Sequence, residues 1–219
     1  MADETIMGWT AAARLAAAEL AEGLDARPGD GVWAHASLCD GWTVLDVLAH
    51  MTLSTRTGWR ELLPAIVRAR GDFDRMEAEQ ARARARAFTP AELIAQLRET
   101  ASSPRRSPGS GALDPLVDGL VHAQDMARPL GLAVAMPTDA ATAALGHVLG
   151  SRFYGARKRF RGVRLVAQDA EFAAGEGAEL RGPVAELLMV ATGRPAGLAA
   201  LSGAGLGRVA AAMGGTAIP

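Results

Sequence analysis

The stretch "DPLVDGLVHAQDMARPLG", residues 114–131, places three polar side chains at helical spacing among apolar ones. Asp118, His122 and Asp125 are four and then three residues apart, so in a helix they share one face. We expect this helix to end near Pro129, because proline does not continue a helix. The shared face is therefore either a solvated outer surface or a set of groups gathered for chemistry.

A second segment repeats part of this pattern. "DVLAH" runs from Asp46 to His50, and "DGLVH" runs from Asp118 to His122. A carboxylate four residues before a histidine can share a metal ion with it, or accept a hydrogen bond from its ring. His50, Asp118 and His122 would together supply the three protein ligands of a catalytic zinc site, which keeps one position open. Asp46 and Asp125 would then lie behind the imidazoles or on the substrate side.

Two other interpretations fit the same spacing. Each Asp–His pair can be an ordinary contact between residues i and i+4 on a helix, in a bundle that binds no metal. Alternatively, the bundle binds a metal or another ligand in a regulatory role and catalyses nothing. A closed coordination shell, with His147 or Asp125 as a fourth protein ligand, would favour this binding role.

Hydrophobic periodicity predicts a mostly α protein. Thr89 and Glu92 form a capping box at the start of one helix, and Asp40 is the expected N-cap of another. We expect breaks in the helical pattern at Pro64 and Gly71. Together the helices predict an antiparallel bundle over residues 1–160, with segments at 7–24, 41–59, 65–86, 89–101, 114–131 and 137–160.

After Phe160 the residue pattern is no longer that of consecutive long helices. Residues 162–182 contain two strand-like pieces around a glycine-containing turn, which predicts a β-hairpin. A helix is expected over residues 183–193 and a further short helix within residues 195–213. We therefore predict a small α+β domain over residues 161–219.

Composition excludes several classes of protein. Of the 219 residues, 49% are hydrophobic and 21% are charged, which is typical of a globular protein. A formal net charge of -1 gives no electrostatic reason to expect nucleic acid or an acidic membrane as a partner. The acidic N-terminal segment and the absence of a long apolar run predict a cytoplasmic protein without a membrane span.

Two local features are expected to be structural. Cys39 is the single cysteine, so the chain forms no internal disulfide, and without a basic neighbour we expect a buried, inert thiol. Arg82, Arg84 and Arg86 alternate near Glu77. Alternate residues splay around a helix, so this segment is expected to be a solvated face rather than a nucleic-acid surface.

Three segments carry a resemblance to a known family. "CDGWTVLDVLAHM" (39–51), "PLVDGLVHAQDMARPLG" (115–131) and "RGPVAELLMVATGRPAGLAALSG" (181–203) resemble, in this order, the mycothiol-dependent maleylpyruvate isomerase family of the DinB-like superfamily. The resemblance covers most of the chain. It implies a DinB-like four-helix bundle that carries a divalent metal, usually zinc, followed by a small α+β domain.

The resemblance also implies roles for particular residues. The metal ligands of the family fall on His50, Asp118 and His122, and Asp118 stands where the isomerase usually has a glutamate, one methylene longer. Arg194 is the nearest match to a C-terminal arginine that assists catalysis, and would hold an anionic substrate. Asp125 would assist by orienting an imidazole.

The function implied by the resemblance is that of a metal-dependent enzyme that uses a thiol. Mycothiol, or a similar low-molecular-weight thiol, would act on a small electrophilic substrate by isomerisation or S-transfer. Zinc is the first expectation for the metal, although two imidazoles and a carboxylate also suit nickel, iron and manganese. A monomer and a homodimer are both compatible with the sequence.

Overall fold

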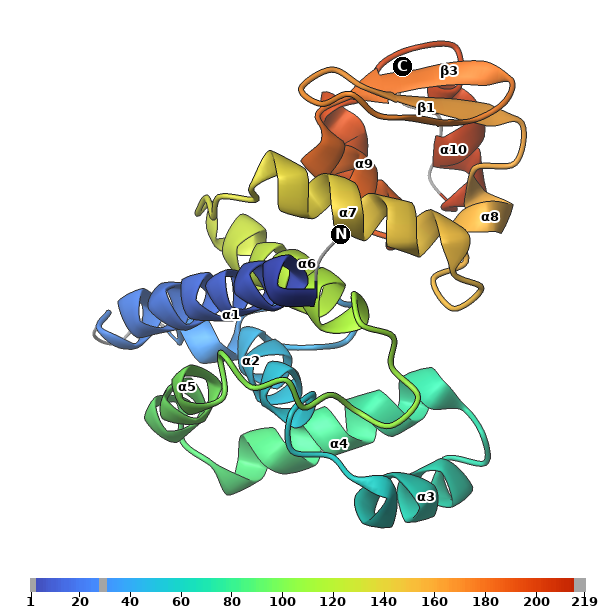
Figure 1. Cartoon of the computed structure of the whole chain (residues 1–219). Coiled ribbons are helices and arrows are strands. Elements are labelled where there is room, and N and C mark those ends of the chain that lie inside the picture. Colours follow the sequence, from blue (N-terminus) through green and yellow to red (C-terminus); the bar gives the residue numbers. More distant parts are fainter. Residues whose placement is uncertain (1–2, 28–30, 215–219) are drawn as a thin grey trace. The chain divides into compact units, whose positions relative to one another are not determined.

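The computed structural model describes residues 3–27 and 31–214 (Figure 1). It is mostly helical, with one three-stranded sheet towards the C-terminus, as the sequence predicted. The chain divides into two compact units at residues 135 and 136, and each is described by itself. The predicted boundary between residues 160 and 161 falls inside the second unit.

The first unit is helical. Its elements are α1 (Asp3–Asp25), η1 (Val32–Ala34), α2 (Val44–Leu53), α3 (Trp59–Arg68), α4 (Phe73–Ala87), α5 (Pro90–Glu99), α6 (Asp114–Ala127) and η2 (Arg128–Leu130). α1 packs against α5 and α6, and α2 packs against α4, α5 and α6. α2 and α6, which carry the two Asp–His patterns, are therefore direct neighbours.

The core between these helices combines small side chains from α1 with larger aliphatic ones from α2 and α5. Its fully buried members include Ala17, Ala18, Ala21, Leu24, Val47, Leu48, Leu93 and Met126. The close approach of α1 and α6 requires Gly119, because a Cβ atom there would lie 3.0 Å from the Cβ of Ala13. This close contact with α1 fixes the position of α6 at the residue next to Asp118.

The predicted helix over residues 41–59 is wrong at both ends, because α2 ends at Leu53 and Trp59 already begins α3, and the predicted break at Pro64 is wrong too. α2 begins at Val44, because Thr43 and not Asp40 is its N-cap and forms a capping box with Asp46. Pro64 lies inside α3 and does not break it. It is exposed, so water can satisfy the carbonyl group that loses its helical donor. The predicted break at Gly71 and the capping box at Thr89 are confirmed.

The second unit contains α7 (Thr138–Gly150), α8 (Ala156–Arg159), β1 (Val163–Ala167), β2 (Ala173–Gly175), β3 (Ala178–Gly182), α9 (Val184–Ala191), η3 (Pro195–Ala200) and α10 (Leu206–Ala212). The strand order is β2-β1-β3. β1 pairs antiparallel with β2, as a hairpin requires, and parallel with β3. The hairpin is therefore only part of the sheet. Its turn lies between β1 and β2, whereas the glycine-containing turn that the sequence suggested lies between β2 and β3, which do not pair with each other.

α7 belongs with this second unit. It was expected to extend to residue 160 as a member of the bundle, but it ends at Gly150 and packs against α9. Its buried residues Ala141, Ala144, Leu145 and Val148 form an apolar stripe. Such a stripe indicates that a helix packs on a partner, but it does not identify the partner.

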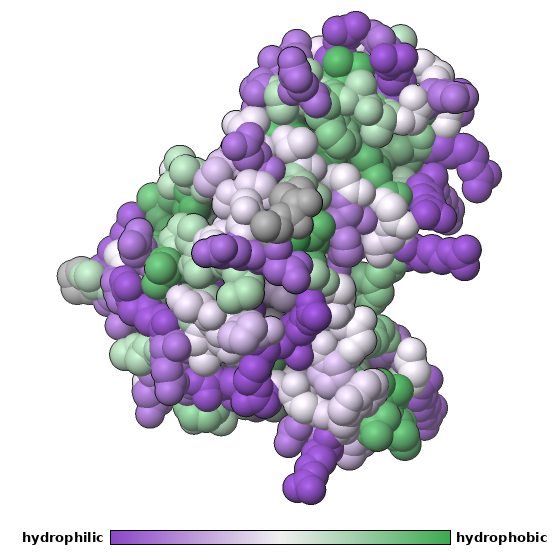
Figure 2. All heavy atoms as spheres, in the orientation of Figure 1, coloured by the Kyte–Doolittle hydropathy of each residue, from purple (hydrophilic) through white to green (hydrophobic). Residues whose placement is uncertain are grey.

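The surface seen in Figure 2 is a mixture of hydrophilic residues with scattered apolar ones, which is ordinary for a globular protein. Within the described residues, none of the helices combines the length and the apolar character needed to cross a membrane.

Candidate metal centre

α2 and α6 bring the three predicted ligand residues together. His50 extends from α2, and Asp118 and His122 extend from successive turns of α6. Asp118 Oδ1 lies 3.3 Å from His50 Nε2 and 3.2 Å from His122 Nε2. One donor atom from each residue lies within 4.8 Å of the other two. The imidazoles meet edge to face, with ring centroids 4.9 Å apart.

These spacings fit a shared metal ion. Two ligands at about 2.0–2.2 Å from a tetrahedral ion are about 3.3–3.5 Å from each other. A charge-assisted hydrogen bond between nitrogen and a carboxylate is shorter, about 2.7–2.9 Å. Both contacts of Asp118 Oδ1 are long for charge-assisted hydrogen bonds and lie close to the spacing that two ligands of one ion would have. The Asp118 side chain reaches both imidazoles. It can therefore act as a ligand together with His50 and His122, although it is one methylene shorter than a glutamate.

The same three groups are strongly coupled when no metal is bound. Burial raises the pKa of Asp118, but hydrogen bonds and the charges of His122 and His50 outweigh it, so this pKa is well below its usual range. Burial lowers the pKa of His122, but contacts with Asp118, then Asp125 and Cys39, outweigh it and raise this pKa well above its usual value. A metal ion entering here must therefore displace a firmly held proton from His122.

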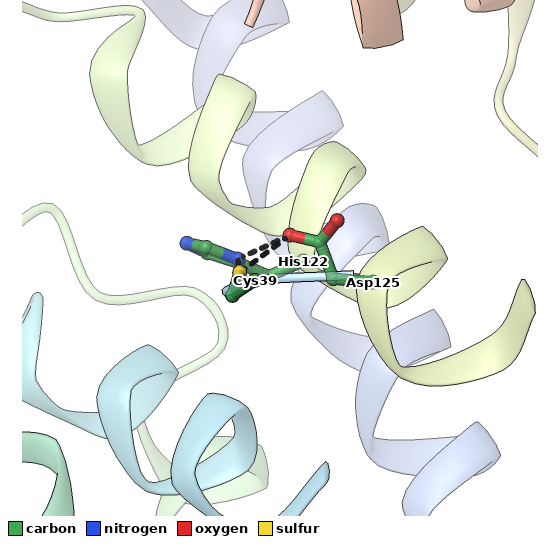
Figure 3. A group of neighbouring side chains, drawn as sticks. All are labelled: Cys39, His122 and Asp125. Atoms are coloured by element: carbon green, nitrogen blue, oxygen red, sulfur yellow. Dashed lines mark hydrogen bonds and ion pairs between the residues drawn. The ribbon is translucent and has the colours of Figure 1, made fainter. Parts of the chain in front are cut away.

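His122 uses its second ring nitrogen for a different contact. Nδ1 lies 2.8 Å from Oδ2 of Asp125, a normal hydrogen-bond distance, and the Asp125 side chain is fully buried. Cys39 donates its thiol proton to the same Oδ2 at 3.2 Å (Figure 3). Nε2 of His122 therefore points at the candidate metal position while Nδ1 points at a buried carboxylate, an arrangement common at protein metal sites.

Asp46 does not orient His50, contrary to one expectation from the repeated pattern. Its Oδ2 accepts hydrogen bonds from the Thr43 backbone N–H at 2.9 Å and from the Thr43 hydroxyl at 2.8 Å. The carboxylate is thus used to cap α2. Among the described residues, Nδ1 of His50 is buried without a hydrogen-bond partner. The edge of the Trp42 ring packs against His50, with centroids 5.2 Å apart.

Glu77 on α4 is a site neighbour that the sequence interpretation missed. Burial raises its pKa, and its carboxylate interacts electrostatically with His50, Asp118 and His122. The expected solvated face is therefore wrong for Glu77, although Arg82 and Arg86 are exposed. A signal was present, since Glu77 lies one helical turn before the fully buried Ala81.

Arg14 on α1 is a second missed neighbour. Its guanidinium is buried and donates to the carbonyl groups of Thr100, Ala101 and Ser103 just beyond α5. Burial lowers the pKa of Arg14, and the negative charge of Asp118 opposes this effect. A buried positive charge thus lies within electrostatic range of the candidate carboxylate ligand.

Two predicted residues lie in the second unit. Arg194 is half-buried after α9, and its Nη1 donates to the carbonyl group of Thr192 at 2.7 Å. Arg194 is a neighbour of Arg159. Burial lowers the pKa of Arg159, and the positive charge of Arg194 lowers it further. His147 lies on α7, where its ring packs edge-on against Tyr154.

Fold and site together define a class of protein: a helical bundle that presents two imidazoles and a carboxylate from facing helices, followed in the chain by a small α+β unit. Residues 11–136 match the family model described as the mycothiol maleylpyruvate isomerase N-terminal domain. The match spans more than half of the chain, so this protein belongs to that family, as the resemblance indicated.

Two solved structures share the fold. One is the mycothiol-dependent maleylpyruvate isomerase, with a TM-score of 0.60 and 12% sequence identity. The other is a histidine-to-alanine mutant of that isomerase, with a TM-score of 0.62 and 10% identity. Each comparison covers 93% of both chains. No functionally curated protein matches the sequence.

Proposed function

We propose that this protein is a metal-dependent enzyme that uses mycothiol, or a similar low-molecular-weight thiol, on a small electrophilic substrate. The observation that carries the proposal is the pair of distances, 3.3 and 3.2 Å, from two imidazole nitrogens to one oxygen of Asp118. Family membership supports the thiol, because the family model is named for a mycothiol isomerase.

In this proposal His50, Asp118 and His122 would hold the metal. A divalent metal bound there, with zinc as the first candidate, lowers the pKa of a coordinated thiol so that the thiolate exists near neutral pH. Asp125 is a positioning residue, because its carboxylate accepts a hydrogen bond from the Nδ1–H of His122 and so keeps the Nε2 lone pair available. Arg194 stays a prediction from the family resemblance, as a group that would hold an anionic substrate.

The proposed chemistry is addition of the thiolate to a carbon–carbon double bond conjugated to a carbonyl group. A C–S bond forms while the π electron pair moves to the carbonyl oxygen, which leaves a single bond free to rotate. Reversal breaks the C–S bond, restores the double bond and returns the thiolate, so the net reaction is cis–trans isomerisation. If the carbon next to the carbonyl group instead takes up a proton, the thioether is retained and the reaction is S-transfer.

The first test is metal content, measured by elemental mass spectrometry on protein purified without an affinity tag. We expect about one metal ion per chain, lost in both His50→Ala and His122→Ala. His35→Ala is the matched control, because His35 is exposed and contacts the Ala36 carbonyl group. Absence of metal, even after incubation with zinc, would contradict the proposal and leave a metal-free bundle.

The second test is turnover of a cis-configured, conjugated carbonyl substrate with and without mycothiol. We expect product formation only when metal and thiol are both present. A protein that holds metal at the three ligands and shows no thiol-dependent turnover across isomerisation and S-transfer assays has the binding or regulatory role instead.

A further inference from the structure

We propose that Cys39 is a positioning residue whose thiol holds the Asp125 carboxylate and, through it, the orientation of the His122 imidazole. The proposal extends the proposed function, since it concerns how a metal ligand is held. It also makes a claim about the metal-free protein that does not depend on that function.

The hydrogen bonds around Asp125 carry the inference. Its side chain is fully buried, and a buried carboxylate is stable only when donors satisfy its oxygens. Oδ2 accepts from His122 Nδ1 at 2.8 Å and from the Cys39 thiol at 3.2 Å. The sulfur is also 3.8 Å from Nδ1, so the three side chains form one compact cluster (Figure 3).

The backbone around Cys39 is built to present its side chain to α6. Ser37 Oγ accepts a hydrogen bond from the Cys39 N–H at 3.1 Å and donates to the Trp42 carbonyl group at 2.9 Å. The Leu38 N–H donates to the backbone carbonyl group of Asp125 at 3.1 Å. The turn therefore docks on Asp125 through a backbone contact and a side-chain contact at once.

Distances distinguish this role from that of a second metal site. Cys39, His122 and Asp125 carry three ligand-type atoms within 4.8 Å of one another, so they too can be considered for an ion. Two ligands of one tetrahedral ion lie about 3.3 Å apart. The 2.8 Å between Nδ1 and Oδ2 is a hydrogen-bond length, and it places a proton where the ion would have to be.

The consequence for His122 is a fixed ring. A proton held on Nδ1 by Asp125 leaves Nε2 directed at His50 and Asp118. Without the thiol, Oδ2 loses the hydrogen bond from Cys39, and the carboxylate can turn away from Nδ1. Cys39 thus acts on the orientation of the His122 imidazole through the Asp125 carboxylate.

The direct test uses NMR of the metal-free protein to measure exchange of the His122 Nδ1 proton with water. We expect this exchange to be at least about tenfold faster in Cys39→Ala than in wild type. Cys39→Ser is the matched control, because it has nearly the same size as alanine and keeps a donor, so exchange should return close to the wild-type rate. Equal exchange in wild type and Cys39→Ala would overturn the proposal, whether or not the protein binds metal.

The second test compares zinc affinity by competition with a chelator. Asp125→Asn should weaken binding by about 10- to 100-fold, and Cys39→Ala by about tenfold. The double variant should bind no more weakly than Asp125→Asn alone, because Cys39 acts through that carboxylate. Additive losses, or an equal loss in Cys39→Ser and Cys39→Ala, would overturn the proposal. So would a sulfur-to-cobalt charge-transfer band in the cobalt-loaded protein, because Cys39 would then be a ligand.

Discussion

At the scale of single residues, His122 is the group on which the site depends, because each of its ring nitrogens faces a different carboxylate. Nε2 is 3.2 Å from Asp118 and Nδ1 is 2.8 Å from Asp125. An imidazole held in this way is most stable as its cation until a metal replaces the proton. Two predictions follow from the charges around it.

The first concerns pH and the stability of the metal-free protein. The pKa of His122 is higher in the folded than in the unfolded chain. Its contribution to folding stability is therefore complete below about pH 6.5, the pKa of an unfolded histidine, and is lost as the pH rises through the folded pKa. The folded pKa of Asp118 is lowered, so its contribution is present above about pH 3.9 and is lost as pH falls further. Denaturant unfolding across pH should show both declines. His122→Gln should lack the alkaline one, and an identical alkaline slope in that variant would contradict the assignment.

The second concerns Glu77. Burial raises its folded pKa, so any stabilising contribution is present only below about pH 4.3 and is lost as pH rises through the folded value. In the metal-free protein, Glu77→Gln should therefore increase stability at pH 7, with the gain vanishing near pH 4. Glu79→Gln is the control on the same helix, because Glu79 is ion-paired with Arg75 at the surface and should show no gain.

At the scale of elements, the position of α6 depends on how closely it approaches α1. Gly119→Val adds atoms where a Cβ alone would already be 3.0 Å from Ala13. We expect it to lower unfolding stability by about 1–3 kcal/mol, as overpacked sites do. Gly146 on α7 is an exposed helical control with open space around it, where the same substitution should change stability by less than about 0.5 kcal/mol.

Arg14 joins α1 to the end of α5. Arg14→Met would leave the carbonyl groups of Thr100, Ala101 and Ser103 without this donor. We expect a loss of about 2 kcal/mol in denaturant unfolding, because three buried or partly buried acceptors share the one guanidinium. Arg98→Met removes an ion pair with Glu22 at the surface, where solvent screens the charges, and should cost less stability than Arg14→Met. A smaller loss for Arg14 than for Arg98 would contradict this account.

At the scale of the whole molecule, a metal held by α2 and α6 should stabilise the folded chain. Binding to the folded state alone adds about 4 kcal/mol when free zinc is 1,000 times its dissociation constant. Thermal unfolding should therefore shift upward on zinc addition and return after chelation. Metal-free His50→Ala should unfold normally but show no zinc-dependent shift, and a shift equal to that of wild type would place the binding elsewhere.

Much of the site was visible in the sequence because helices are local structures. A hydrogen bond from residue i to residue i−4 repeats the same geometry along the chain, so spacing alone aligned Asp118, His122 and Asp125 on one face. The capping box at Thr89 was predictable for the same reason, because its partners are three residues apart. The two Asp–His patterns and the flanking segments also indicated the family.

Tertiary structure alone decided which local features act together. His50 meets Asp118 across 68 residues, and Cys39 meets Asp125 across 86, through contacts that no local spacing encodes. The two Asp–His patterns are alike in sequence, yet Asp46 caps its own helix while Asp118 faces both imidazoles. An apolar stripe indicates that one face of a helix is buried. It does not identify the element on which that face packs, because the hydrophobic effect is non-directional.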